Sequence, residues 1–222
     1  MYYRHEWKHE INYADTLMLR QRLRCVMKPD PNARGGSYFI RSLYFDNLRD
    51  KALREKIDGV DIREKFRIRY YDFDDSLIHL EKKSKRHGLG HKDSADLTRE
   101  EVEKIIAGDI DWMADCDRDL IRELHHKMIT QGLRPKTIVD YKREPFVFPA
   151  GNVRVTLDYD IRTCPDIRAF FDKTAITIPT GGDIILEVKW DEFLPTVIRD
   201  AVQLGSRRTS AFSKYAVCRK FG

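Results

Sequence analysis

The sequence predicts an α+β fold: a closed antiparallel β-barrel of about eight strands with helices packed on its outside. Two observations lead to this prediction. Several segments alternate charged and apolar side chains with a period of two, so each would present different residue types on the two faces of a strand. Between them lie stretches whose apolar residues recur at helical spacing, some with a capping signal at the start.

The clearest alternating segment runs from Arg63 to Tyr71. It places a cation at every second position, namely Arg63, Lys65, Arg67 and Arg69, with mostly apolar residues between them. Like charges on one face of a strand repel each other. Such a row is therefore stable only where water surrounds it or where it faces an anion.

Four further segments share this design and are predicted to be strands: 3–11, 80–85, 153–162 and 183–190. A β-sandwich would place all the apolar faces in one central core. A barrel that turns its charged faces inward and its apolar faces toward outer helices fits the pattern better. Its interior would suit a polyanion bridged by a metal ion, because a few carboxylates lie among the cations.

Local signals predict the other elements. Asn12 with Asp15 is suited to cap one helix, and Thr98 with Glu101 forms a capping box for another that ends at Gly108. Further helices are expected at 119–132, at 195–204, before Gly59 and near the end of the chain. The stretch 72–76 reads as a hairpin turn, and 84–93 as a flexible basic connection.

Length and composition point to one soluble domain, residues 1–222. Hydrophobic residues make up 41% of the chain, enough for a sizeable core, and 35% of the residues are charged with a net charge of only +5. The basic character is therefore local. Basic patches that bind duplex nucleic acid lie on exposed helices or surfaces, whereas these cations lie on barrel-like strands, so no nucleic-acid partner is expected.

The cysteines and the hydropathy predict a cytoplasmic location. The four cysteines are scattered and form no Cys-x-x-Cys pair, which argues against a zinc site or a disulfide framework and favours a reducing compartment. No apolar run approaches the roughly 20 residues that cross a bilayer, and the N-terminus does not read as a signal peptide. No transmembrane segment is therefore expected.

Eight short motifs occur in an order that resembles VTC-type polyphosphate polymerase domains, which belong to the CYTH-like superfamily of triphosphate tunnel metalloenzymes. Each motif is weak by itself, but the series spans nearly the whole chain. The motifs are Arg4-x-Glu6-x-Lys8, Tyr44-Phe45-Asp46, Lys65-x-Arg67-x-Arg69, Glu81-x-Lys83-x-Lys85, Tyr141-x-Arg143, Arg154-x-Thr156-x-Asp158, Glu187-x-Lys189 and Ser213-Lys214-Tyr215.

The resemblance implies a tunnel of eight antiparallel strands that transfers the terminal phosphate of ATP to a growing inorganic polyphosphate chain with Mn²⁺ or Mg²⁺. Glu187 is the implied metal ligand. The implied catalytic phosphate ligands are Lys8, Arg67, Arg69, Lys83, Arg143, Arg154 and Lys214. The implied substrate-binding residues are Lys65, Lys85, Lys92, Lys189 and Tyr141. A membrane-associated partner protein is also compatible with the resemblance.

Two other functions keep the same cations and stay open at this point: hydrolysis of triphosphate or polyphosphate, and sensing of polyphosphate or nucleotide without turnover. The hydrolytic branch of the superfamily carries Glu-x-Glu-x-Lys on its first strand, whereas this chain has Arg4 at the first of those positions. That change removes one carboxylate from the side where a hydrolase would bind metal or orient water. The acidic residues on the charged faces are interpreted as orienting partners of the cations: Glu6, Glu10, Glu81, Asp158 and Asp160.

Overall fold

The computed structural model describes residues 4–205 and 211–221. Eight strands follow one another in a sheet in the order β1-β10-β8-β7-β3-β4-β5-β6, and the short strands β2 and β9 pair with β7 and β8. The strands are β1 (His5–Ile11), β2 (Lys28–Pro29), β3 (Tyr38–Asp46), β4 (Arg63–Tyr71), β5 (Asp74–Arg86), β6 (Leu89–Leu97), β7 (Arg134–Phe148), β8 (Val153–Cys164), β9 (Ile178–Pro179) and β10 (Ile184–Trp190). The helices are α1 (Tyr13–Val26), α2 (Lys51–Ile57), α3 (Arg99–Ala107), α4 (Asp119–Gln131), α5 (Thr196–Val202) and α6 (Lys214–Cys218).

The α+β class is confirmed, but the closed barrel is not. Within the described ranges, β1 and β6 end the strand order and no hydrogen-bonded ladder joins them, so the sheet is open. The alternation of side chains determines which face of each strand is charged. It does not determine whether the first and last strands of the order meet, and this is why the sequence pattern did not reveal the open edge.

The chain forms two compact units. Unit 1 comprises residues 1–39, 141–161 and 179–212, and unit 2 comprises 40–140, 162–178 and 213–222. The boundaries fall inside β3, β7, β8 and β9 and just before α6. Each unit has its own cluster of buried apolar side chains.

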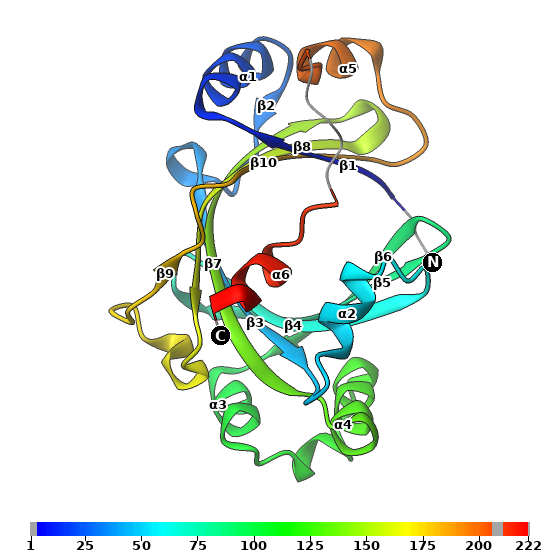
Figure 1. Ribbon diagram of the computed structural model, residues 1–222, viewed down its shortest axis with the longest axis vertical. Helices are drawn as coiled ribbons and strands as arrows, with labels where there is room; N and C mark the ends of the chain where they lie inside the picture. The colour runs from blue at the N-terminus through cyan, green and yellow to red at the C-terminus, as the bar shows by residue number, and fades with distance from the viewer. Residues whose placement is uncertain (1–3, 206–210, 222) are drawn as a thin grey trace. The chain divides into compact units, whose positions relative to one another are not determined.

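In unit 1, helices α1 and α5 cover the apolar face of β1, β8 and β10, and the two helices lie side by side (Figure 1). The predicted cap of α1 is confirmed, because Asn12 and Asp15 exchange side chain–backbone hydrogen bonds of 2.9 and 3.0 Å. The core beneath the helices contains Val155, Leu186 and Val188, all fully buried. Their neighbours in the sequence lie on the charged face.

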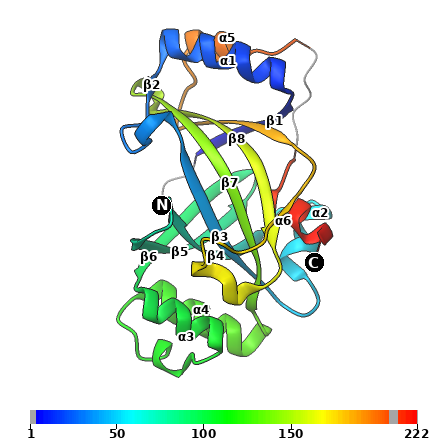
Figure 2. The ribbon, with the colours of Figure 1, turned by 90° about the vertical axis from the view of Figure 1, so that its left-hand side faces the viewer.

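In unit 2, helices α3 and α4 cover β4 and β5 in the same way (Figure 2). Thr98 and Glu101 form the predicted capping box of α3, and Gly108 ends that helix with a left-handed φ of 85°. Phe66 and Ile68 of β4 are buried in this core. The cations that alternate with them therefore occupy the other face of the strand.

Two hairpins join β4, β5 and β6. Asp72 and Phe73 have φ of 49° and 57°, and His87 and Gly88 have φ of 51° and 81°, as two-residue turns with both central residues left-handed require. The first turn is the predicted one. The prediction of a flexible connection at 84–93 is wrong, because the glycines there belong to the second turn and to β6 while the flanking residues form a ladder. In the part of the chain that the structure describes, no helix has both the length and the apolar character needed to cross a membrane.

Replacement of Leu124 by Ala should lower the free energy of unfolding by about 3 kcal/mol, because this side chain of α4 is fully buried in the unit 2 core. Chemical denaturation measured by circular dichroism checks the value. Ile129 lies on the same helix and is 63% exposed, so Ile129→Ala is the matched control and should change the free energy by less than about 0.5 kcal/mol. Equal losses for the two variants would contradict the assigned face of α4.

Candidate functional site

The charged faces hold two clusters of cations, one in each unit. The Glu81 cluster belongs to unit 2 and consists of Lys65, Arg67, Arg69, Glu81, Lys83 and Lys92. The Glu187 cluster belongs to unit 1 and consists of Glu6, Lys8, Arg143, Asp158, Glu187 and Lys189. All the residues proposed from the sequence as phosphate or metal ligands lie in these clusters, except Lys85, Tyr141, Arg154 and Lys214.

Glu81 is the centre of the first cluster. It is only 3% exposed, and its carboxylate accepts a 2.6 Å hydrogen bond from Arg67 and a 3.0 Å one from Lys92. Arg69 lies 3.7 Å from the same carboxylate and donates to Ser42 at 3.0 Å. Burial by itself would raise the pKa of Glu81, but these three cations hold it well below its usual range. Glu81 therefore stays ionised and orients the cations around it, as interpreted from the sequence.

A row of three lysines crosses the same cluster. Lys65 on β4 is directly opposite Lys83 on β5, and Lys83 is directly opposite Lys92 on β6. Like charges directly opposite each other on neighbouring strands destabilise a sheet. The cluster as defined holds five cations for one carboxylate, so its net charge is positive.

The last motif of the sequence, Ser213-Lys214-Tyr215, contacts Tyr44 and Asp46 of β3. The Tyr44 ring stacks on Tyr215 of α6 at 5.1 Å, and the Tyr215 hydroxyl donates to Asp46 at 2.7 Å. Asp46 also accepts hydrogen bonds from two backbone N–H groups at the start of α2. Ser213 caps α6, and Lys214 is the first residue of that helix.

In the Glu187 cluster, carboxylates and ammonium groups alternate across two strands. Lys8 is opposite Glu187, and Glu6 is opposite Lys189. Lys8 Nζ lies 3.1 Å from Glu6 and 3.3 Å from Glu187, while Lys189 Nζ lies 3.1 Å from Glu187 and 3.5 Å from Glu6. Each ammonium group is therefore shared by the same two carboxylates.

Arg143 completes this cluster. Its guanidinium binds both oxygens of Asp158, at 2.6 and 2.7 Å, and reaches Glu187 at 3.2 Å. The guanidinium also lies 5.4 Å from the centre of the Tyr141 ring. Asp158 is thus a positioning partner of Arg143, as interpreted from the sequence.

The electrostatics of the Glu187 cluster follow from burial and from these pairs. Burial would raise the pKa of Glu187, yet Lys189, Lys8 and Arg143 hold it well below its usual value. Burial would lower the pKa of Lys8, but Glu187 and Glu6 raise it. For Lys189 burial prevails and lowers the pKa. Glu187 is therefore a charged acceptor in the absence of ligand.

Arg154 has a separate anchor that the sequence reasoning did not identify. Its guanidinium forms an ion pair with the buried carboxylate of Asp30 and a 2.9 Å hydrogen bond with the Tyr38 hydroxyl. Asp30 lies more than a hundred residues earlier in the chain, so no local pattern connects it with Arg154. The only local sequence signal at Asp30 is its position between Pro29 and Pro31, and this position indicates a turn but not an ion pair with Arg154.

Asp160 lies outside both clusters, and its backbone departs from the predicted alternation of β8. Asp160 forms an ion pair with Lys142 at 3.5 Å. Its φ of 52° interrupts the alternation of β8, which was predicted to continue through Arg162. Arg162 instead donates to Thr177 at 2.7 Å. A left-handed residue inside a strand changes the direction of the following side chains, and sequence spacing does not show it.

The carboxylates near Glu187 fit a divalent ion only if the substrate completes the ligand set. Among the described residues, no group of three or more His, Cys, Asp or Glu side chains could hold a metal by itself. The carboxylates of Glu187 and Glu6 nevertheless lie close together, because both contact the Nζ atom of Lys8. The buried hydroxyl of Thr156, opposite Glu187, has no hydrogen-bond partner within the described ranges. Mg²⁺ sites commonly use one or two carboxylates together with phosphate oxygens.

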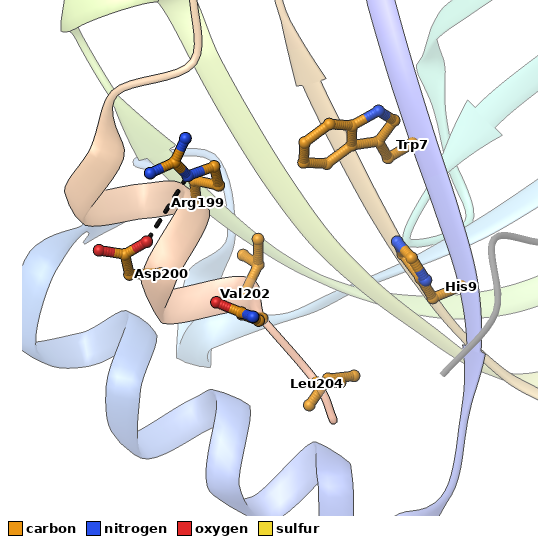
Figure 3. A pocket seen from close by; sticks show the side chains of 7 residues that line it. Trp7, His9, Arg199, Asp200, Val202 and Leu204 are labelled. Carbon is orange, nitrogen blue, oxygen red and sulfur yellow. Dashed lines mark ion pairs between the residues drawn. The ribbon is translucent and has the colours of Figure 1, made fainter. Parts of the chain in front are cut away.

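A cleft of about 440 Å³ lies elsewhere in unit 1, between β1 and α5 (Figure 3). Trp7 and His9 line it from the strand, and Val202 and Leu204 belong to its other wall. Trp7 and His9 alternate with Lys8 along β1. The cleft therefore lies on the face opposite the Glu187 cluster and is separate from the candidate site.

Solved structures with the same fold share little sequence with this chain. The PH1012 protein from Pyrococcus horikoshii is 10% identical, has a TM-score of 0.53, and matches over 96% of this chain and 98% of its own. The PH1819 protein from the same organism is 15% identical, with a TM-score of 0.51 and coverage of 99% and 100%. A Bacillus halodurans protein with a provisional adenylate cyclase name is 14% identical, with a TM-score of 0.50 and coverage of 84% and 81%. At these identities the likeness shows the fold alone.

These neighbours therefore share the α+β fold described above. The VTC domain model matches residues 3–221, and the chain belongs to that family. No match was found among curated proteins.

Replacement of Lys83 by Met should leave the melting temperature of the ligand-free protein unchanged or higher, because Lys83 is the middle cation of the lysine row. The affinity for tripolyphosphate, measured by calorimetry, should fall by about tenfold or more because a charged hydrogen bond is lost.

Lys82 provides the matched control for this prediction. It points to the opposite face of the same strand and binds Glu123 at 2.7 Å and Asp93 at 3.2 Å. Lys82→Met should leave tripolyphosphate affinity unchanged. A strongly destabilised Lys83→Met protein with normal affinity would show that the lysine row is structural.

Proposed function

We propose that this protein is a metal-dependent phosphotransferase that transfers the terminal phosphate of ATP to a growing inorganic polyphosphate chain. The observation that carries the proposal is the lysine row of the Glu81 cluster, with Lys65, Lys83 and Lys92 opposite one another. A sheet keeps like charges in such positions at a cost in stability, and a polyanion removes that cost. Membership of the VTC family supports the same substrate class.

The proposed ligands differ in what they offer a phosphate group. Arg67, Arg69, Arg143 and Arg154 can each present two N–H groups to two phosphate oxygens, whereas a lysine acts as a point charge. The arginines are held by fixed acceptors, so little side-chain entropy is lost when phosphate binds. The remaining proposed ligands are Lys8, Lys65, Lys83, Lys85, Lys92, Lys189, Lys214 and Tyr141.

Phosphoryl transfer depends mainly on positioning and on neutralising charge on the transferring group. A terminal phosphate of the acceptor chain is already ionised near neutral pH, so no general base is proposed. We assign Glu187 as the protein ligand of Mn²⁺ or Mg²⁺, with Glu6 beside it. The ion would supply charge neutralisation on phosphate oxygens that lysine and arginine do not reach. Residues 1–222 are proposed to act as one functional domain, since β3, β7 and β8 contribute to both units.

Hydrolysis of the same substrates is the second candidate, and Arg4 argues against it. Arg4 pairs with Asp191 at 2.7 Å and also binds the carbonyl of Asn152. The position that would carry a carboxylate in the hydrolytic branch is therefore occupied by a cation with its own structural partners. A sensor without turnover would use the same cations, and the assay below separates it from the enzymes.

Incubation of the protein with ATP and Mn²⁺ should yield long polyphosphate, because bound polyphosphate can accept the phosphate that the arginines position. Gel electrophoresis with polyphosphate staining, together with a free-phosphate assay, checks the outcome. Omission of Mn²⁺ is the control. Free phosphate alone would indicate a hydrolase, and binding of ATP or polyphosphate with neither product would indicate a sensor.

Glu187→Gln should reduce turnover by on the order of a hundredfold or more, because the amide keeps the shape but not the charge that a hard divalent ion requires. Metal-free binding of tripolyphosphate should persist or become tighter, since Lys8, Lys189 and Arg143 then lose a competing anion. Glu192 is exposed and lies just after β10, so Glu192→Gln is the matched control. Retained turnover with an ordinary manganese requirement in Glu187→Gln would make Glu187 an ion-pair partner only.

A further inference from the structure

Tyr44 lies among the cations of the Glu81 cluster, but it is not one of the phosphate ligands proposed above. It is buried at 3% exposure on β3, directly opposite Arg67 of β4. Arg67 donates a 3.0 Å hydrogen bond to the Tyr44 hydroxyl. Lys65 Nζ lies 5.3 Å from the centre of the Tyr44 ring, and the Arg67 guanidinium lies 5.8 Å from it.

The groups facing Tyr44 come from several elements. From β4 they are the cations Lys65, Arg67 and Arg69, and from α6 the stacked ring of Tyr215 with Lys214 next to it in the sequence. Glu81 of β5 reaches the site through Arg67. On β3 itself, Asp46 is occupied by the Tyr215 hydroxyl and by the N-terminus of α2.

These surroundings favour the phenolate form of Tyr44. Burial opposes ionisation and would raise the pKa, but Arg67, Lys65 and Arg69 outweigh it and lower the pKa to about 7. The pKa of the neighbouring Tyr215 is raised instead, by burial and by Asp46. Two stacked tyrosines thus differ in their protonation because one faces cations and the other a carboxylate.

We propose that Tyr44 is a proton-linked phosphate ligand: its phenolate partly neutralises the Glu81 cluster when the site is empty, and it takes up a proton when polyphosphate binds. The inference rests on the proposed function, because it requires a polyanion in this cluster. A bound phosphate supplies the negative charge that the phenolate supplied before. One proton moves from solvent to the Tyr44 oxygen, which changes from an acceptor into a donor toward a phosphate oxygen.

The sign of the pH effect follows from linkage. Between the pKa of the free protein, about 7, and an ordinary tyrosine value of about 10, binding takes up as much as about one proton per ligand. Affinity for tripolyphosphate should then fall by up to about tenfold for each unit of rising pH in that interval. At lower pH Tyr44 is already protonated, and this dependence disappears.

The test measures metal-free binding of tripolyphosphate by calorimetry in two buffers with different heats of ionisation, at about one pH unit above the pKa of Tyr44. The ultraviolet absorbance of tyrosinate is followed in parallel. Wild-type protein should take up protons and lose tyrosinate absorbance when the ligand binds. Tyr44→Phe should show neither change, and its affinity should depend less on pH. Ionisation of the ligand itself is common to all variants and cancels in the comparison.

Tyr70→Phe is the matched control, because Tyr70 is also buried and lies on β4 with its hydroxyl donated to the Phe170 carbonyl at 2.7 Å. Burial raises its pKa to about 12, so it stays protonated in the tested interval and its loss should leave proton uptake unchanged. Normal binding with equal proton uptake in wild type and Tyr44→Phe would overturn this inference and leave the proposed function standing. Absence of tripolyphosphate binding by the wild type would overturn both.

Discussion

Two buried carboxylates, Glu81 and Glu187, allow the charged faces of this sheet to hold many cations. Each lies within 4 Å of three Lys or Arg side chains and remains ionised despite its burial. Without them the cations would lose a shared anion and repel one another more strongly, and a buried carboxylate without cations would also be unfavourable. The two types of charge are therefore stable only together, and their sum still leaves the Glu81 cluster positive.

The apolar faces of the strands hold these charges in position. Phe66 and Ile68 fix β4 under α3 and α4, and Leu186 and Val188 fix β10 under α1 and α5. A strand buried on one face cannot slip by a single residue, because every cation would then enter the core. The cores thus set the register in which Lys65 meets Lys83 and in which Lys8 meets Glu187.

Contacts between distant segments position further side chains of the proposed site. Asp46 joins the start of α2 to Tyr215 of the last helix, and Asp30 orients Arg154. Tyr44 stacks on Tyr215 of that last helix and accepts a hydrogen bond from Arg67 of β4. A single phenolic oxygen there can change its charge with little movement, which makes it suited to follow the charge of a ligand.

The sequence by itself determined the α+β class, the caps of α1 and α3, the Asp72-Phe73 hairpin and the charged faces of β1, β4 and β10, because these depend on side-chain alternation and on residues close together in the chain. It also located most members of both clusters through their motifs. Only the tertiary structure decided that the sheet is open, that residues 84–93 form a hairpin, and that Asp160 pairs with Lys142. The pairs Asp30–Arg154, Asp46–Tyr215 and Tyr44–Arg67 likewise required it. Long-range pairing, strand closure and a left-handed backbone inside a strand depend on contacts between remote segments, and a local pattern does not specify them.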